Sequence, residues 1–136
     1  MTRQNGILLA SMLLLMAAMA SAQTHQVTVS VPFSFVAGHQ ELPAGDYTIE
    51  QNRGQASAIL RSGKGRGMIL SATKSDREFE DRSYVLFRRS GTHYFLAEVW
   101  REGAGQVLPP GNLERELTSK HATREVARVE ARLSTQ

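Results

Sequence analysis

The chain begins with its longest apolar run. A short polar start that carries Arg3 precedes residues 7–19, which are almost entirely apolar, and the small residues 20–22 follow. A charged start, an apolar segment and a small-x-small site in this order are typical of a secretory signal peptide. We therefore expect residues 1–22 to be a cleavable signal peptide and the mature chain to begin at Gln23.

A retained membrane anchor is the alternative interpretation of this run. Residues 7–22 number only 16, whereas about twenty apolar residues are needed to cross the hydrocarbon core of a bilayer. The chain contains no cysteine, so a lipoprotein, which needs an acylated cysteine after cleavage, is excluded. We expect a periplasmic or secreted protein.

Strict alternation marks the segment that follows. Apolar residues occupy every second position at Val27, Val29, Val31, Phe33 and Phe35. This period of two predicts a β-strand with one buried face. Because proline has no backbone N–H, Pro32 predicts a sheet edge or a bulge at that point. Shorter strands are predicted over residues 46–51, 55–61 and 67–73.

The strongest predicted pair is a hairpin formed by residues 83–89 and 92–101. Gly91 lies between them and can adopt the positive φ that a tight hairpin turn requires. The expected register places Phe87 opposite Tyr94. Both faces of the hairpin are apolar near the middle, so we expect other parts of the chain to cover it on both sides.

The pattern changes to a helical period from Asn112 onward. Leu113 and Leu117 are four residues apart, and four further apolar residues follow at steps of four, three and four: Ala122, Val126, Val129 and Leu133. This spacing predicts an amphipathic helix of about twenty residues with Asn112 as its N-cap. We expect its apolar stripe to pack on the sheet, with self-association through this helix as the alternative.

These elements predict one mainly β domain after the signal peptide. The β domain is expected to cover residues 23–111 and the C-terminal helix residues 112–136, with six to seven antiparallel strands in a sandwich or a small barrel. Removing residues 1–22 leaves 114 of 136 residues, a usual size for a single domain. Without cysteine, this domain must be stabilised by its hydrophobic core rather than by disulfides.

Charge excludes one class of partner. The net charge of +3 falls to +2 when Arg3 leaves with the signal peptide, and both signs are mixed along the chain. A nucleic-acid-binding domain would concentrate basic residues in one stripe with aromatic residues among them. We therefore expect no nucleic-acid partner.

The sequence predicts no catalytic residue, cofactor or metal site. Its four histidines, His25, His39, His93 and His121, lack the short spacings of a local zinc motif, and no cysteine is available. No Gly-x-Ser-x-Gly motif occurs. Glu98 interrupts an apolar run, and we expect it to pair with a neighbouring arginine such as Arg82 or Arg101.

Three residues are candidates for contact with a partner or ligand. Lys64 and Arg66 lie in a Gly-rich basic loop that lacks the spacing of a phosphate-binding P-loop. This loop could contact anionic glycans or lipid headgroups, or it could simply connect two strands. Trp100 could stack on a ligand, and the alternative is an aromatic residue of the core or its rim.

Four segments in a fixed order resemble a recurrent group of small secreted bacterial proteins of unknown function. They read VPFSF at residues 31–35, LPAGDYTI at 42–49, YVLF at 84–87 and YFLAEVW at 94–100. The likeness covers about residues 27–117. It implies secretion, and because the group has no activity to transfer, it implies no catalytic residue.

Three functions are compatible with these observations. The leading one is a non-enzymatic exported protein that serves as a binding or structural component of the cell envelope or the secreted fraction. Its partner could be an envelope protein, a glycan or a small apolar ligand. The alternative is a carrier with an apolar cavity inside a β-barrel, and a hydrolase comes third.

Overall fold

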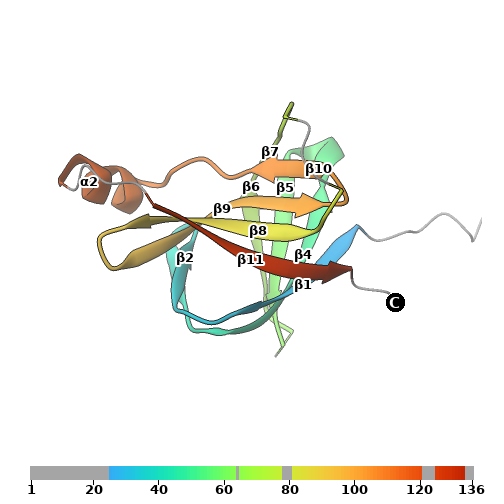
Figure 1. Ribbon diagram of the computed structural model, residues 1–136, viewed down its shortest axis with the longest axis horizontal. Helices are drawn as coiled ribbons and strands as arrows, with labels where there is room; N and C mark the ends of the chain where they lie inside the picture. The colour runs from blue at the N-terminus through green and yellow to red at the C-terminus, as the bar shows by residue number, and fades with distance from the viewer. Residues whose placement is uncertain (1–24, 64, 78–80, 121–124, 134–136) are drawn as a thin grey trace, which may run out of the picture.

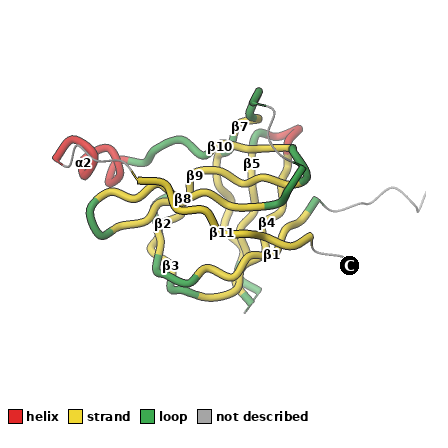
Figure 2. The backbone as a smooth tube through the Cα atoms, viewed as in Figure 1, coloured by secondary structure: helices red, strands yellow, loops and turns green. Residues whose placement is uncertain are grey.

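The computed structural model describes residues 25–63, 65–77, 81–120 and 125–133. Most of these residues belong to one strongly curled β-sheet with the shape of an open half-barrel (Figures 1 and 2). The prediction of a mainly β fold is confirmed. The predicted signal peptide, Lys64 and His121 lie outside the described residues.

The described part of the chain contains eleven strand segments, one short 3₁₀ helix and one α-helix. In chain order they are β1 Gln26–Val31, β2 Phe35–Ala37, β3 Gln40–Leu42, β4 Gly45–Asn52, η1 Arg53–Gln55, β5 Ser57–Ser62, β6 Gly67–Ser71, β7 Thr73–Lys74, β8 Tyr84–Ser90, β9 His93–Arg101, β10 Ala104–Val107, α2 Asn112–Lys120 and β11 Glu125–Leu133. This exceeds the predicted six to seven strands, because several very short strands carry no clear periodicity.

The strands follow the order β3-β2-β9-β8-β11-β1-β4-β5-β6, and β10 pairs with both β9 and β7. All of these pairs are antiparallel except the single parallel bridge between Val36 of β2 and Phe95 of β9. β6 and β7 follow one another in the chain, but β6 pairs with β5 whereas β7 pairs with β10. The segment from β6 to β7 therefore joins the two halves of the curled sheet at one end.

The first strand lies inside the sheet rather than at an edge. β1 pairs with β4 on one side and with β11 on the other, so of the two alternatives predicted from Pro32 the sheet edge is wrong. The predicted strand is instead interrupted after Val31 and resumes as β2 at Phe35. β1 ends at Val31, and Pro32 follows it directly. No ladder hydrogen bond is lost, because the proline stands just outside the strand.

The hairpin of β8 and β9 is confirmed, but its register differs from the expected one. Gly91 adopts a φ of 62° in the turn, and Phe87 lies opposite Leu96 rather than Tyr94. The register then shifts, because Leu86 pairs with Glu98 and the intervening Ala97 is left without a partner. Ala97 therefore forms a β-bulge, which reverses the alternation of the residues that follow it on β9.

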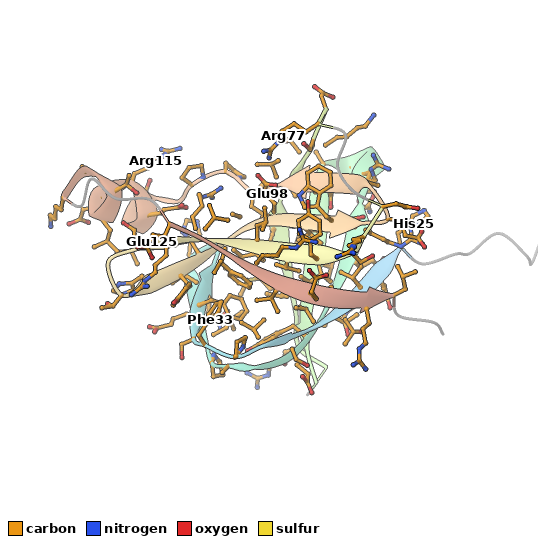
Figure 3. All side chains as sticks on the ribbon, in the orientation of Figure 1. His25, Phe33, Arg77, Glu98, Arg115 and Glu125 are labelled. Atoms are coloured by element: carbon orange, nitrogen blue, oxygen red, sulfur yellow. The ribbon has the colours of Figure 1, made fainter. Side chains whose placement is uncertain are left out.

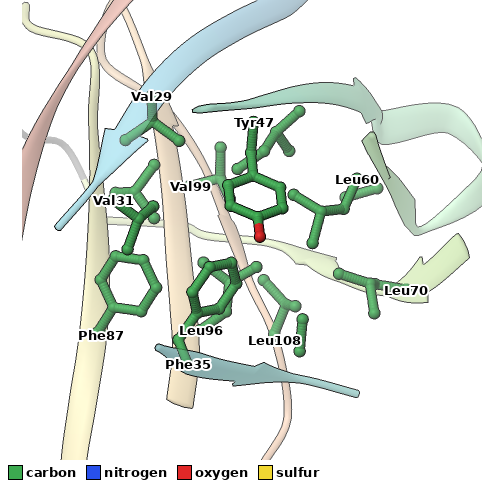
Figure 4. Packing of buried hydrophobic residues seen from close by; sticks show 14 of the residues in the cluster. Val29, Val31, Phe35, Tyr47, Leu60, Leu70, Phe87, Leu96, Val99 and Leu108 are labelled. Atoms are coloured by element: carbon green, nitrogen blue, oxygen red, sulfur yellow. The ribbon is translucent and has the colours of Figure 1, made fainter. Parts of the chain in front are cut away.

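The interior of the half-barrel is filled by apolar side chains from both halves of the sheet (Figure 4). The ring of Phe35 meets those of Tyr47 and Phe87 edge to face, at centroid distances of 5.1 and 5.3 Å. Val85 and Val99 lie opposite one another and are fully buried in the same cluster. This cluster joins the half that contains β4, β5 and β6 to the half that contains β8 and β9.

The C-terminal segment corrects the predicted helix. α2 covers only Asn112–Lys120, and residues 125–133 form β11, which lies between β8 and β1 (Figure 1). Its burial alternates, with Ala127, Val129 and Ala131 packed against the core. The segment thus adopts the strand period of two rather than the helical spacing. By pairing with both β8 and β1, β11 covers edges of these two strands that would otherwise be open.

Candidate functional site

The strand β6 lies at one end of the sheet and carries the exposed side chain of Ile69. β6 pairs with β5 on one side and has no second strand neighbour in the part of the chain that the structure describes. Two backbone hydrogen bonds to the β5 side show which edge of β6 faces β5. One lies just before the strand, from Ser62 N to Arg66 O at 3.3 Å, and the other just after it, from Ala72 N to Ala56 O at 3.0 Å.

In an antiparallel ladder, every second residue of a strand bonds to a given neighbour, and the residues between them direct their N–H and C=O groups the other way. Since Arg66 and Ala72 bond toward β5, the backbone groups of Gly67, Ile69 and Ser71 are directed away from it. Among the residues that the structure describes, these three peptide positions have no strand partner on that side, and they follow one another at regular spacing. The Ile69 side chain beside them is 76% exposed.

A groove of about 320 Å³ runs along one part of this edge. Ile69, Leu70 and Ser71 form one wall, while Phe95 and Leu96 of β9 contribute apolar surface. Residues 108–112, Glu114 and Arg115 line another part of the groove, and Val36, Gly38 and His39 complete it. Residues 108–112 are anchored at the β9 bulge, because Leu108 N donates to the Ala97 carbonyl at 2.8 Å. The unpaired bulge residue thus positions the segment that encloses the groove.

A second groove of about 260 Å³ lies along the beginning of β6. Gln40 and Leu42 of β3 contribute to it together with Arg66 and Met68. Gly38 lines the larger groove with a φ of +61°, and a Cβ placed on it would be 3.0 Å from Leu70 Cδ2. A left-handed backbone and this close approach both favour glycine there. We call the two grooves and the β6 edge between them the seam.

The charges around the seam are mainly basic. The exposed side chains of Arg66 and Arg115 line its two grooves, and His39 is also exposed there. Neither guanidinium forms an ion pair with a carboxylate among the described residues. The acidic residue of the lining, Glu114, is 5% exposed and is bound by the guanidinium of Arg88.

The pairing of Glu114 with Arg88 fixes the start of α2 against the sheet. Arg88 Nη2 donates to the Leu108 carbonyl at 3.1 Å and to Glu114 Oε2 at 3.2 Å. A buried carboxylate with such a partner is neutralised locally and does not repel an anion. The exposed arginines therefore set the charge of the seam, and Arg115 projects from α2 at its rim (Figure 3).

The predicted ligand contact Trp100 is fully buried and lies outside the seam. Its ring stacks on Tyr84 with centroids 6.0 Å apart, and a Cβ at Gly105 would approach the ring to 2.6 Å. Its indole N–H donates to Glu98 Oε2 at 2.8 Å. The structure therefore places Trp100 as a packed aromatic residue, as in the alternative interpretation of the sequence.

The prediction that Glu98 pairs with an arginine is confirmed, but the arginine is neither of the two examples that the sequence suggested. The Glu98 carboxylate pairs with Arg77, which approaches from the segment after β7, rather than with Arg82 or Arg101 (Figure 3). Arg128 of β11 lies over the Tyr84 ring, with its guanidinium carbon 4.0 Å from the ring centroid. These contacts cover the outer face of the hairpin, in agreement with the expectation that both of its faces would be covered.

Of the two predicted contact residues that the structure describes, Arg66 lies in the seam and Trp100 does not. Sequence reasoning missed Ile69, His39 and Arg115. A signal for Ile69 was present, because Met68, Ile69 and Leu70 are three consecutive apolar residues in a predicted strand. Successive side chains of a strand point to opposite faces, so Ile69 must face away from the side that Met68 and Leu70 share.

Within the described ranges, no three His, Asp or Glu side chains lie close enough to hold a metal ion. Burial raises the pKa of Tyr47 above 10.0. Its hydroxyl donates to the Pro43 carbonyl at 2.5 Å.

No helix in the described residues is both long enough and apolar enough to cross a membrane.

Comparisons with protein-family models, with curated proteins and with solved structures found no match to this chain. The resemblance to a group of small secreted bacterial proteins therefore stays a prediction.

Proposed function

We propose that this chain is an exported, non-enzymatic protein that binds a macromolecular partner in the seam. The observation that carries the proposal is the free edge of β6, where an apolar side chain exposed to 76% stands beside unpaired peptide groups and two grooves. Natural sheets usually cover or charge such an edge, because it is a template for pairing with other chains. An uncovered edge is thus the expected state of a binding protein without its partner.

The packing of the interior favours this function over an apolar-ligand carrier. A carrier needs an enclosed apolar cavity. Here the ring of Phe35 contacts the rings of both Tyr47 and Phe87 inside the half-barrel, where a carrier would hold its ligand. The two grooves of the seam instead lie at its surface, where a partner can reach them.

The side chains of the seam also favour binding over hydrolysis. A hydrolase needs a nucleophile or an activated water held by a base, and the base must be free to accept a proton. Glu114, which is the carboxylate of the larger groove, is bound by Arg88. The remaining polar lining consists chiefly of arginine, histidine, asparagine and serine side chains with no such arrangement.

Export is part of the proposal and has its own test. The full chain, produced in a bacterial host with a C-terminal tag, should be recovered from the periplasm or the medium. Its N-terminal residue should then be Gln23 by Edman degradation. Recovery of a chain that still begins with Met1 would contradict export with cleavage.

The binding site is tested by a photo-crosslinking amino acid placed at position 69 of the chain in an exporting bacterium. The matched control carries the same group at Arg132, which is exposed at the end of β11. We expect one discrete adduct from position 69, none from position 132, and loss of the adduct when Arg66 and Arg115 are both changed to Glu. Equal adducts from both positions, or none from position 69, would refute the seam as the binding site.

A further inference from the structure

We propose that the ligand of the seam is an extended, acidic polypeptide segment that pairs with β6 as an additional β-strand. This inference rests on the proposed function, because it names the chemistry of what the seam binds. It follows from three features of the seam: the spacing of the free backbone groups, the position of the apolar surface and the sign of the charge.

The free backbone groups select a polypeptide. Gly67, Ile69 and Ser71 present N–H donors and C=O acceptors at every second residue. Two residues of a strand span about 6.7 Å, and another extended strand repeats its own donors and acceptors at the same distance. A glycan or a small apolar molecule has no such repeat. Addition of a strand to an exposed sheet edge is an established mode of peptide recognition.

The apolar surface defines which side chains the segment should carry. A strand added to β6 would direct alternate side chains to the face where Leu70 lies, toward Leu96 and Leu108, which line the larger groove and belong to the same core cluster as Leu70. Leu70, Leu96 and Leu108 are each 4% exposed, and all three contribute apolar surface to that groove. The segment should therefore have apolar residues at alternate positions, with its other side chains on the outer face beside Ile69.

The charge of the seam selects acidic residues for the outer positions. Arg66 lies at the beginning of β6, and Arg115 lines the groove along the rest of the strand. Carboxylates on the added strand would meet these exposed guanidinium groups. A second copy of this chain would instead bring like charges together, because pairing of two β6 edges in antiparallel orientation places the same arginines around one ladder. The charge thus favours a different, acidic chain over a dimer.

The test uses a synthetic heptapeptide in which Glu and Val alternate, with both ends blocked, and the mature chain. Binding is measured by isothermal titration calorimetry and by NMR shift changes at low salt. A peptide with Lys in place of Glu should bind about tenfold more weakly or worse, because it repels Arg66 and Arg115. Raising the salt concentration should weaken binding of the acidic peptide.

Strand pairing is tested by two backbone-methylated forms of the acidic peptide. One is methylated at the Glu nitrogens and the other at the Val nitrogens, so charge and side chains are the same in both. Because only every second N–H of an added strand faces β6, one form should lose binding by about tenfold or more while the other retains it. Equal binding of the two forms would overturn strand addition.

Two double variants test the location. Arg66→Glu with Arg115→Glu should weaken binding of the acidic peptide by about tenfold or more. Arg53→Glu with Arg132→Glu makes the same change of charge at exposed positions outside the grooves and should leave binding nearly unchanged. Equal weakening by both pairs would show a non-specific charge effect and would overturn the inference.

The failures of the two proposals can be told apart. If no peptide binds while position 69 still yields its adduct in cells, the ligand class is wrong and the binding site stands. If neither occurs, both proposals fail. If sedimentation shows a stable dimer whose β6 amides are protected from exchange, the occupant is a second copy, and the acidic strand is excluded.

Discussion

At the scale of single residues, Trp100 shows how one side chain depends on neighbours from distant parts of the chain. The ring is 0% exposed and stacks on Tyr84, and Gly105 of β10 lies directly opposite it in the ladder. A Cβ at position 105 would lie 2.6 Å from the ring, closer than real contacts allow. The absence of a side chain at Gly105 is therefore what makes room for the indole.

Changing Gly105 to Ala should destabilise the protein by about 1–3 kcal/mol, because the indole must leave its position or the strand must shift. Chemical denaturation followed by tryptophan fluorescence measures this change. Gly54→Ala is the matched control, since no heavy atom lies within 4 Å of a Cβ at that position. A Gly105→Ala variant as stable as Gly54→Ala would contradict the packing of Trp100 described above.

Tyr47 gives a prediction about pH. Burial raises its pKa above 10.0, so the folded state holds the phenolic proton more tightly than the unfolded state does. The stabilisation from this group is complete below about pH 10 and is lost as the pH rises through the raised pKa. Tyr47→Phe removes this pH dependence and also loses the hydrogen bond to Pro43, at a cost of about 1 kcal/mol.

The free energy of unfolding of the wild type and of Tyr47→Phe should therefore be compared at pH 8 and at pH 11. We expect the wild-type advantage at pH 8 to shrink at pH 11. An advantage that stays constant or grows would show that Tyr47 is not held in its neutral form by burial.

Sequence patterns predicted residues of the core better than residues of the candidate site. Alternation identified Val27, Val29 and Val31, all of which are at most 3% exposed. Trp100 allowed two interpretations, because an aromatic residue at a strand end gives no sign of what covers it. In the structure Trp100 is covered by Gly105 and Tyr84. Both residues reach it through strand pairing, which a local sequence pattern does not specify.

At the scale of elements, β11 is the clearest case in which two patterns compete. The spacing of Val126, Val129 and Leu133 fits a helix, but Ala127, Val129 and Ala131 also alternate with charged residues. Over nine residues both periods have partial support, and β-branched valines favour a strand. Pairing with β8 and β1 decides the outcome, because these two strands bracket the segment in the sheet.

Ending the chain after Lys120 should therefore abolish cooperative unfolding, because β8 and β1 would lose the strand between them. Circular dichroism during thermal denaturation measures this loss. Val126→Thr in the full chain is the control, since this side chain is 65% exposed and the change should stay within about 0.5 kcal/mol. A truncated chain that still unfolds cooperatively would contradict the central position of β11.

The hairpin shows the limit of local prediction for strand register. The turn at Gly91 was predicted correctly, because glycine and the flanking apolar runs are local signals. The bulge at Ala97 was not, since nothing in the sequence around it marks an extra residue. This bulge also holds Leu108 beside the seam, so the main positioning contact of the candidate site was hidden as well.

At the scale of the whole molecule, the sheet order places the candidate site. β6 and β9 are distant in the sequence and do not pair, yet both contribute to the larger groove because the sheet curls. A mainly β fold could be predicted from short periodic segments. The open half-barrel and its seam could not, because they depend on pairings between strands far apart in the chain.

The central claim is that β6 has a free edge at which a partner strand can pair. NMR-detected amide hydrogen exchange of the mature protein without a ligand tests it most directly. We expect slow exchange at Met68, Leu70 and Ala72, whose amides face β5, and fast exchange at Gly67, Ile69 and Ser71. Slow exchange at all six amides would show that the edge is already covered and would contradict the account.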